Sequence, residues 1–339
     1  MPSTSRERKT TGRFAVLLNT NAQRVDARVT RRVGELVEPG DVYVSGTPEE
    51  ASQVVRAISN GGYDTVFTCG GDGTVTDFIN RYAEGVEDSP KLGILSFGAG
   101  NAMSQMVSSG DPLSDLRQFI ANPSSDTTSL PLCQAEGTRF AFASLGLDAQ
   151  VLADYQRLHA GFGRMSGGVE NLGGYIAAAV GLTLPRLVAR SVLRRSLKVR
   201  VTNLGQSAFK IERTADGGGS VGQPVGPGEV LYEGPANRTV FGTCPFYGFG
   251  VAALPFAGLD RDRFHLRVSN VHPARMLLGL RGLWKGTFQH SALHDFHVER
   301  VHLEFNEPVP YMCAGEVQGL RRSMTIGMSE RSVDLVRFL

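Results

Sequence analysis

Short apolar runs alternate with helix-like segments over the first third of the chain. The runs lie at residues 14–18, 41–45, 64–69 and 92–96. Between the second and third runs, Thr47, Pro48 and Glu50 form a helix start, and apolar residues then recur on one helix face as far as Ile58. Such alternation with short connections predicts a parallel, Rossmann-like α/β sheet with right-handed crossovers.

From about Pro131 onward the hydrophobic pattern changes to the period of two that half-buried strands show. The clearest examples are residues 139–143, 197–202, 263–268 and 300–305. Clusters of glycine and proline separate them, and two other apolar segments, at 173–180 and 274–284, are helix-like. We therefore expect an antiparallel β-sandwich domain with helical insertions.

These patterns divide the chain into a polar tail at residues 1–12, an α/β domain at 13–132 and a β-sandwich domain at 133–321. The tail is too polar for a signal peptide, and no run of 18 apolar residues predicts a membrane span. The four cysteines are scattered without a CxxC pair, which favours reduced thiols. A cytoplasmic protein is expected.

Composition narrows the function classes only a little. Hydrophobic residues make up 41% of the 339 positions and charged residues 20%, which is typical of a folded globular protein. The formal net charge of +2 lacks the basic excess of nucleic-acid-binding proteins, so no nucleic-acid partner is expected. His290, His294 and His297 lie close together but without the spacing of a zinc motif, which favours ordinary polar histidines.

The most informative motif is the sequence Gly70-Gly71-Asp72-Gly73-Thr74, which follows an apolar run and precedes the helix-like segment 75–80. Paired glycines let a ligand approach the backbone, and the start of a helix offers free N–H groups and a positive dipole end that suit phosphate. Asp72 places a carboxylate among these donors. The alternative is a plain turn in which Asp72 caps the helix.

A second glycine turn, Gly98-Ala99-Gly100-Asn101, follows the next apolar run. In a parallel sheet both turns would lie at the carboxyl edge of the strands, where open α/β sheets bind ligands. Two such turns at one edge predict a phosphate site more strongly than either does alone. Asn101 is also explained as a cap of a helix at 102–107.

With these motifs, the chain resembles the diacylglycerol kinase catalytic-domain family, which includes bacterial lipid kinases, sphingosine kinases and ceramide kinases. The matching segments follow the family order: Asn19, Thr47, residues 70–74, 92–102, 143–149, 173–176, 255–257 and 314–316. The Gly100-Asn101-Ala102 sequence is closer to the sphingosine and ceramide kinases.

The resemblance implies an ATP- and Mg²⁺-dependent kinase with a ligand cleft between its two domains, and a C-terminal segment, 322–339, that returns to the first domain. It implies nucleotide contacts from Asn19, Thr47, Gly70, Gly71, Asp72, Gly73, Thr74 and Val75, and from Gly98, Ala99, Gly100 and Asn101. Glu316 and Asp72 are the two candidate catalytic bases, and the sequence does not choose between them.

Three positions depart from the family pattern. Ala99 stands where the family mostly has threonine or serine, and Arg261 where bacterial members have an aspartate at a structural Mg²⁺ site. Ala314 replaces the aspartate of the Asp-Gly-Glu motif. We therefore expect this structural metal to be absent. Two forms of compensation stay open: Asp260 or Asp262 is a weak metal ligand, or the guanidinium of Arg261 takes the place of the ion.

The expected function is an ATP-dependent lipid kinase that phosphorylates a hydroxyl of a diacylglycerol-, sphingosine- or related lipid. The alternative is an impaired kinase-like protein that binds nucleotide or lipid without efficient transfer. The basic residues Arg186, Arg190, Arg194, Arg195 and Lys198 form either a solvated helix face or a peripheral contact with an anionic membrane surface. The apolar residues of 276–284 form either a lipid pocket or a core helix. The oligomeric state stays open.

Overall fold

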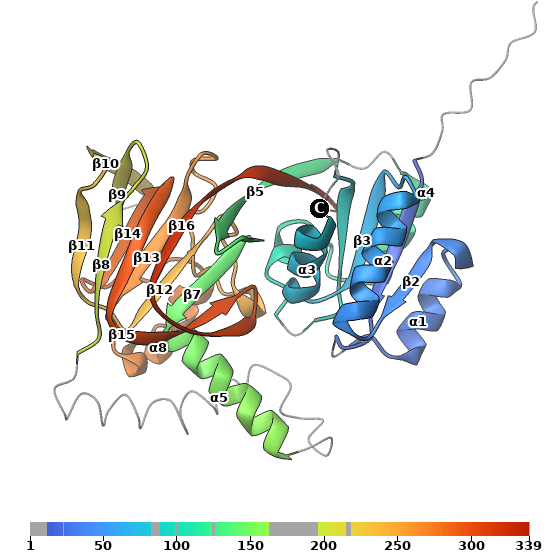
Figure 1. Ribbon diagram of the computed structural model, residues 1–339, viewed down its shortest axis with the longest axis horizontal. Coiled ribbons are helices and arrows are strands. Elements are labelled where there is room, and N and C mark those ends of the chain that lie inside the picture. Colours follow the sequence, from blue (N-terminus) through green and yellow to red (C-terminus); the bar gives the residue numbers. More distant parts are fainter. Residues whose placement is uncertain are drawn as a thin grey trace, which may run out of the picture.

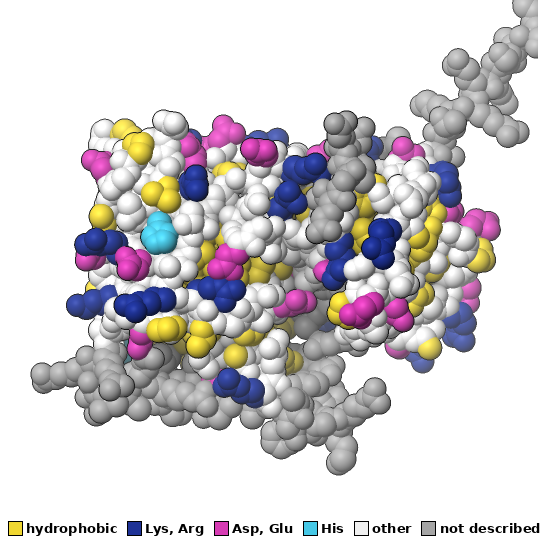
Figure 2. Space-filling model, viewed as in Figure 1, with side chains coloured by type: hydrophobic (Ala, Val, Ile, Leu, Met, Phe, Trp, Pro, Cys, Tyr) yellow, Lys and Arg dark blue, Asp and Glu magenta, His cyan; other side chains and the backbone are white. Residues whose placement is uncertain are grey.

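The computed structural model describes residues 12–22, 24–82, 89–98, 100–123, 126–162, 196–214 and 218–338 (Figure 1). The strands of these residues form one continuous sheet. Its strands are parallel in the N-terminal part and antiparallel in the C-terminal part, as the hydrophobic pattern predicts. Figure 2 shows Lys and Arg side chains interspersed with Asp and Glu over one face of the molecule.

The parallel part is an α/β layer structure in which helices cover both faces of the sheet. Its strands, in the spatial order β4-β3-β1-β2, are β1 (Phe14–Asn19), β2 (Val42–Ser45), β3 (Thr65–Gly70) and β4 (Lys91–Ser96). Its helices are α1 (Ala27–Gly34), α2 (Pro48–Asn60), α3 (Asp72–Tyr82) and α4 (Pro112–Ala121), with 3-10 turns η1 (Pro39–Asp41) and η2 (Met103–Met106).

Alternate residues of β1 belong to different cores. Leu17 packs in the cluster that contains Val55 of α2 and Val75 of α3. Leu18 packs in the cluster that contains Val33 of α1 and Leu116 of α4. Both faces of the strand are therefore buried, which explains why these strands are continuous apolar runs and not alternating ones.

Two helix boundaries differ from the sequence expectation. Helix α3 begins at Asp72 and not at Val75, so the second half of the first glycine motif is already helical. The expected helix at 102–107 is only the 3-10 turn Met103–Met106, because the backbone of Val107 leaves the helical region (φ −140°).

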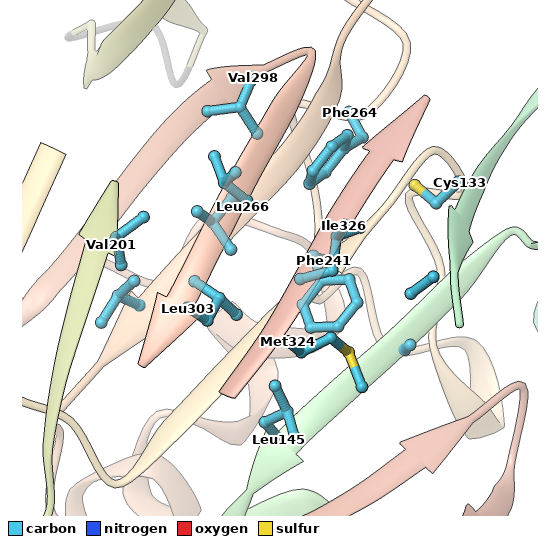
Figure 3. Packing of buried hydrophobic residues seen from close by; sticks show 14 of the residues in the cluster. Cys133, Leu145, Val201, Phe241, Phe264, Leu266, Val298, Leu303, Met324 and Ile326 are labelled. Atoms are coloured by element: carbon cyan, nitrogen blue, oxygen red, sulfur yellow. The ribbon is translucent and has the colours of Figure 1, made fainter. Parts of the chain in front are cut away.

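The antiparallel part contains most of the remaining strands. They are β5 (Thr127–Ala135), β6 (Thr138–Phe140), β7 (Phe142–Gly146), β8 (Lys198–Asn203), β9 (Ala208–Arg213), β10 (Gly219–Val225), β11 (Val230–Pro235), β12 (Arg238–Gly242), β13 (Phe264–Ser269), β14 (Leu293–Val298), β15 (Arg300–Cys313) and β16 (Glu316–Val336). Their inward-facing side chains, among them Phe241, Phe264 and Leu303, form one hydrophobic cluster (Figure 3).

Strand β16 joins the two parts of the molecule. It pairs antiparallel with β15 and β5, and Leu335 near its end pairs parallel with Leu92 of β4. In Figure 1 it runs from the antiparallel strands to the α/β layers. The C-terminal segment thus adds a strand to the first part of the chain.

Three helices interrupt the antiparallel strands in the described residues. Helix α5 (Leu147–Phe162) follows β7, and the segment expected as one helix at 274–284 is a pair, α8 (Pro273–Leu278) and α9 (Leu280–Trp284), separated at Gly279. A 3-10 turn, η5 (Gly248–Gly250), lies nearby in the sequence. The segment 173–180 and the tail 1–11 lie outside the described residues. No helix of the described residues is both long and apolar enough to span a bilayer.

A buried charge network fixes the loop between η5 and β13. The fully buried Arg267 donates from Nε to Asp295 Oδ1 (2.6 Å) and from Nη1 to the Ala253 carbonyl (2.7 Å), and His265 Nε2 lies 2.8 Å from the same carboxylate. Burial alone would raise the pKa of Asp295, but the charge of Arg267 and the His265 hydrogen bond hold this pKa well below its usual value.

We predict that Asp295→Ala lowers the free energy of unfolding by about 3–5 kcal/mol, because it leaves the buried Arg267 without a counter-charge. Urea denaturation followed by circular dichroism measures this loss. The control is Glu233→Ala, which breaks an exposed ion pair with Arg200 and should cost about 1 kcal/mol or less. Equal effects of the two substitutions would contradict the structural role of the network.

Candidate active site

The two glycine turns touch each other at the ends of β3 and β4. A Cβ atom on Gly98 would lie 2.3 Å from the Cα of Gly71, and one on Gly71 would lie 3.3 Å from the Cα of Gly98. The strands place them side by side, since Gly70 and Ser96 are partners in the register. Glycine at position 98 is therefore required by close backbone approach, and the turns form one structural unit.

Asp72 clamps this unit together. Its Oδ2 accepts a hydrogen bond from the Ala102 N–H (2.8 Å), and its Oδ1 accepts one from the Met103 N–H (3.0 Å). The residue is only 7% exposed. Burial raises the pKa of Asp72 to about 6, although the two backbone hydrogen bonds act in the opposite direction. This carboxyl group therefore titrates close to neutral pH.

Glu316 approaches the first turn from the far end of the chain. It is the first residue of β16, and its Oε1 lies so close to Gly73 that a Cβ atom there would be 2.5 Å away. The residue keeps contact with solvent, but the protein around its carboxylate removes part of its water, and this desolvation raises its pKa. The nearby charge of Asp77 raises it further.

A cavity of about 560 Å³ contains both carboxylates. At one end lie Asn19, the two glycine turns and Glu316. The rest of the lining is largely apolar and comes from α5, α8, α9 and the η5 loop. These residues include Leu147, Val151, Leu152, Tyr155, Phe249, Met276, Leu277, Leu280, Leu283 and Trp284. The early aspartate and the late glutamate thus converge on one cavity.

The expected nucleotide contacts divide into two groups. Asn19, Gly71, Gly73, Thr74, Gly98 and Gly100 line the cavity with Asp72. Within this group, Asn19 Nδ2 donates to Thr74 Oγ1 (2.8 Å), which ties β1 to the first turn. Ala99 lies outside the described residues.

The remaining expected contacts have structural partners. Thr47 caps α2 by accepting the Glu50 N–H (3.2 Å), Val75 is buried in the core, and Gly70 packs against Thr74. The Asn101 side chain closes its own turn, because Oδ1 accepts the Gly98 N–H (3.0 Å) and Nδ2 donates to the Gly98 carbonyl (2.6 Å). The expectation that Asn101 caps a helix at 102–107 is therefore wrong, because the N-cap of the 3-10 turn Met103–Met106 is Ala102 and this turn has no side-chain capping hydrogen bond.

Of the two weak metal candidates, Asp260 is engaged within the chain, whereas Asp262 is exposed. Asp260 accepts from Arg263 Nη1 (2.6 Å) and from the backbone N–H of Asp262 (2.9 Å). The guanidinium beside Asp260 thus belongs to Arg263, while Arg261 is exposed. In the described residues, no group of three or more His, Cys, Asp or Glu side chains has the arrangement of a metal site. The donor set does not fit a structural Mg²⁺ at this position.

Sequence reasoning missed a buried ion pair in the wall of the cavity. Arg238, the first residue of β12, places Nη1 3.3 Å from Asp148 Oδ1 near the start of α5, with side chains 8% and 14% exposed. Tyr247, whose hydroxyl lies 2.9 Å from Ser144 Oγ, was missed as well. An isolated arginine in a strand carries no periodic signal, so only the position of Asp148 within a family segment pointed here.

Ala314 occupies a backbone conformation that suits other residues better. With Gly315 it forms the two-residue turn between β15 and β16, and both have positive φ (47° and 86°). Such type I′ turns favour Asn-Gly or Asp-Gly, because an alanine Cβ is crowded in the left-handed region. The turn directly precedes Glu316 and so sets its position at the cavity.

We predict that Ala314→Gly raises the free energy of unfolding by about 1 kcal/mol, because glycine adopts positive φ without strain. Chemical denaturation measures the change. Ala57→Gly, at an exposed position inside α2, is the matched control and should lower stability by about 1 kcal/mol. If both substitutions destabilise alike, the left-handed turn is not a source of strain.

Comparisons with known proteins agree with this architecture. Residues 13–130 match the model of the diacylglycerol kinase catalytic domain family. A protein from Bacillus anthracis str. Sterne assigned as a diacylglycerol kinase has a similar structure (TM-score 0.64, 17% identity), with 96% of this chain and 97% of that chain covered. Another diacylglycerol kinase structure from the same organism gives a TM-score of 0.60 and 13% identity over the same shares.

A comparison of the sequence with curated proteins found no match. The TM-scores show that this chain and the Bacillus structures share a fold over nearly the whole of both chains. At these low identities, the likeness concerns the fold alone. The family model independently covers the segment with both glycine turns. The resemblance of this chain to the diacylglycerol kinase catalytic-domain family is therefore confirmed, with residues 13–130 matching the catalytic domain itself.

Proposed function

We propose that this protein is an ATP-dependent kinase that phosphorylates the hydroxyl of a lipid. The observation that carries the proposal is the cavity, which joins two glycine turns and two carboxylates to a long apolar wall. Its volume of about 560 Å³ is typical of sites for small molecules. The diacylglycerol kinase names of the similar Bacillus structures support the same class of substrate.

The glycine-rich end suits the phosphates of ATP. Helix α3 starts at Asp72, so the free N–H groups and the positive dipole end of its first turn lie at the cavity. Because Gly71 and Gly98 carry no side chains, a phosphate can approach the backbone of both turns. The carboxylate of Glu316 adds negative charge here, which fits a Mg²⁺ ion that arrives with the nucleotide. Bound there, Mg²⁺ would neutralise charge on the transferring phosphoryl oxygens.

The acceptor hydroxyl would be activated by Asp72. A carboxylate that titrates near pH 6 holds little of its proton at neutral pH and is still basic enough to accept one. Its two backbone hydrogen bonds fix the orientation of the carboxylate without using all of its lone pairs. Glu316, beside Gly73, would hold the cation and, through the cation, the phosphate.

We predict that Asp72→Asn lowers kcat about 10²–10⁴-fold in an assay with labelled ATP, Mg²⁺ and lipid micelles. In the unaltered protein, kcat/KM should fall about tenfold per pH unit below about 6, since the base must be deprotonated. Glu316→Gln should raise the Mg²⁺ requirement but keep the inflection near pH 6. Loss of this inflection in Glu316→Gln, with the inflection retained in Asp72→Asn, would make Glu316 the base.

One observation favours a second function, the binding of nucleotide or lipid without efficient transfer. Ala314 places a methyl group in the cavity wall, next to Glu316, where the family pattern has a carboxylate. The same assay separates the two functions. ATP binding without turnover, together with a gain of turnover in Ala314→Asp, would identify the missing carboxylate as the cause.

The rim of the cavity suggests peripheral contact with an anionic membrane. Leu278 of α8 is 89% exposed, and the pocket-lining Met276 and Leu277 precede it directly. Arg275, Arg281 and Lys285 are exposed in the same helix pair, and the sequence from 263 to 294 contains no acidic residue. The basic residues expected for this role at 186–195 lie outside the described residues. All four cysteines are free and buried, which supports a cytoplasmic protein at the membrane.

We predict that Arg275→Glu with Arg281→Glu reduces flotation with vesicles containing anionic lipid by about tenfold or more, since each cation near such a surface contributes about 1 kcal/mol. Leu278→Ser should weaken flotation with neutral and anionic vesicles alike. The control reverses the charges of Arg200 and Lys210, which are exposed on strands β8 and β9. If this control loses as much binding, the contact is not specific to the helix pair.

A further inference from the structure

The wall of the cavity contains a polar element that the phosphoryl transfer does not use. Arg238 and Asp148 line the cavity and form a buried ion pair, with only 8% and 14% of their side chains exposed. Around them the lining from α5 and the α8–α9 pair is largely apolar, with Gln156 of α5 as a polar exception. A cation at such a place must be bonded on several sides or be available to a ligand.

The guanidinium of Arg238 is bonded only in part. Its contact with Asp148 is long for a charged pair, at 3.3 Å, and its Nε is buried without a hydrogen-bond partner among the described residues. A buried N–H without an acceptor is unfavourable. The side chain lines the cavity, so a change of its rotamer would present a guanidinium N–H to a ligand oxygen.

The strand register places this donor away from the phosphate end. Residues Gly242 and Arg238 of β12 pair with Phe142 and Gly146 of β7. Phe142 lies beside the turn before Glu316, because its carbonyl accepts the Ala314 N–H. At a rise of about 3.3 Å per residue, the Arg238 backbone lies roughly 13 Å further along the strand. Its side chain would therefore meet the body of a lipid and not the acceptor hydroxyl.

The charges of the pair define the group that fits. Asp148 balances the charge of Arg238, so the pair offers no net attraction to either a free amine or a free carboxylate. An uncharged acceptor needs no such attraction and can take the unused N–H. In a lipid, the carbonyl oxygen of an acyl ester or amide is such a group, and it lies between the polar end and the chain.

We propose that Arg238, positioned by Asp148, is a specificity determinant that binds the acyl carbonyl of the substrate, so that the protein selects acylated lipid alcohols. This proposal rests on one part of the proposed function, namely that the cavity binds a lipid. Trp284, the single tryptophan of the chain, lines the same cavity, and its fluorescence reports occupancy whether or not phosphate is transferred.

The test compares two lipids that differ only in the carbonyl: a diacylglycerol and the dialkyl ether glycerol with the same chains and hydroxyl, both in detergent micelles. The intact protein should bind the ester at least tenfold more tightly, as a charge-assisted hydrogen bond allows. The double variant Arg238→Met, Asp148→Leu removes both charges, so no unpaired charge stays buried. It should bind both lipids with equal affinity.

The control variant Arg200→Met, Glu233→Leu removes an exposed ion pair outside the cavity and should keep the preference for the ester. Arg238→Lys retains the charge without the planar fork of donors and should reduce the preference severalfold, which tests the role if the double variant does not fold. Equal binding of ester and ether by the intact protein, or an unchanged preference in the Arg238 variants, would overturn the assignment. A preference for the ester without phosphoryl transfer would support the role of Arg238 and would contradict only the proposed kinase activity.

Discussion

The backbone contact between the two glycine turns is the constraint on which the site depends. Gly71 and Gly98 approach so closely that a side chain on Gly98 would collide with the other turn, and Asp72 holds them together through the N–H groups of Ala102 and Met103. A buried carboxylate is unfavourable by itself, and the raised pKa of Asp72 is a measure of this. The same burial that is costly for folding brings the pKa of the carboxyl group close to neutral pH, which the proposed role of Asp72 as a base requires.

Much of this arrangement follows from local sequence. The apolar runs, the capping residue Thr47 and the paired glycines specify the parallel sheet and the edge at which the turns lie, because each acts through its own neighbours. The start of α3 at Asp72 does not follow, since Gly73 is a poor helix former, and the first turn packs against residues outside it, Gly70 and Glu316. Tertiary contacts override propensity there.

The cavity wall could not be predicted for a different reason. Arg238 has no periodic pattern around it, and its partner Asp148 lies on a helix that the sequence did not indicate. The division of the segment 274–284 into two short helices also depends on packing, because a Cβ on Gly279 would collide with the ring of Phe288. The structure at these positions is determined by contacts between segments that are distant in the sequence. The glycine turns, in contrast, can be recognised from a few consecutive residues.

Strand β16 combines a local turn at one end with a long-range strand pairing at the other. Its first residue, Glu316, is held at the cavity by the tight turn at Ala314, and its other end pairs with β4, the strand that leads into the second glycine turn. One strand therefore fixes both the acidic side chain and the sheet edge that it faces. Because the turn imposes positive φ on Ala314, the position of Glu316 depends on backbone strain that an asparagine or glycine would relieve. The methyl group of Ala314 belongs to the apolar part of the cavity lining, so the strained turn gives the cavity an apolar surface close to Glu316.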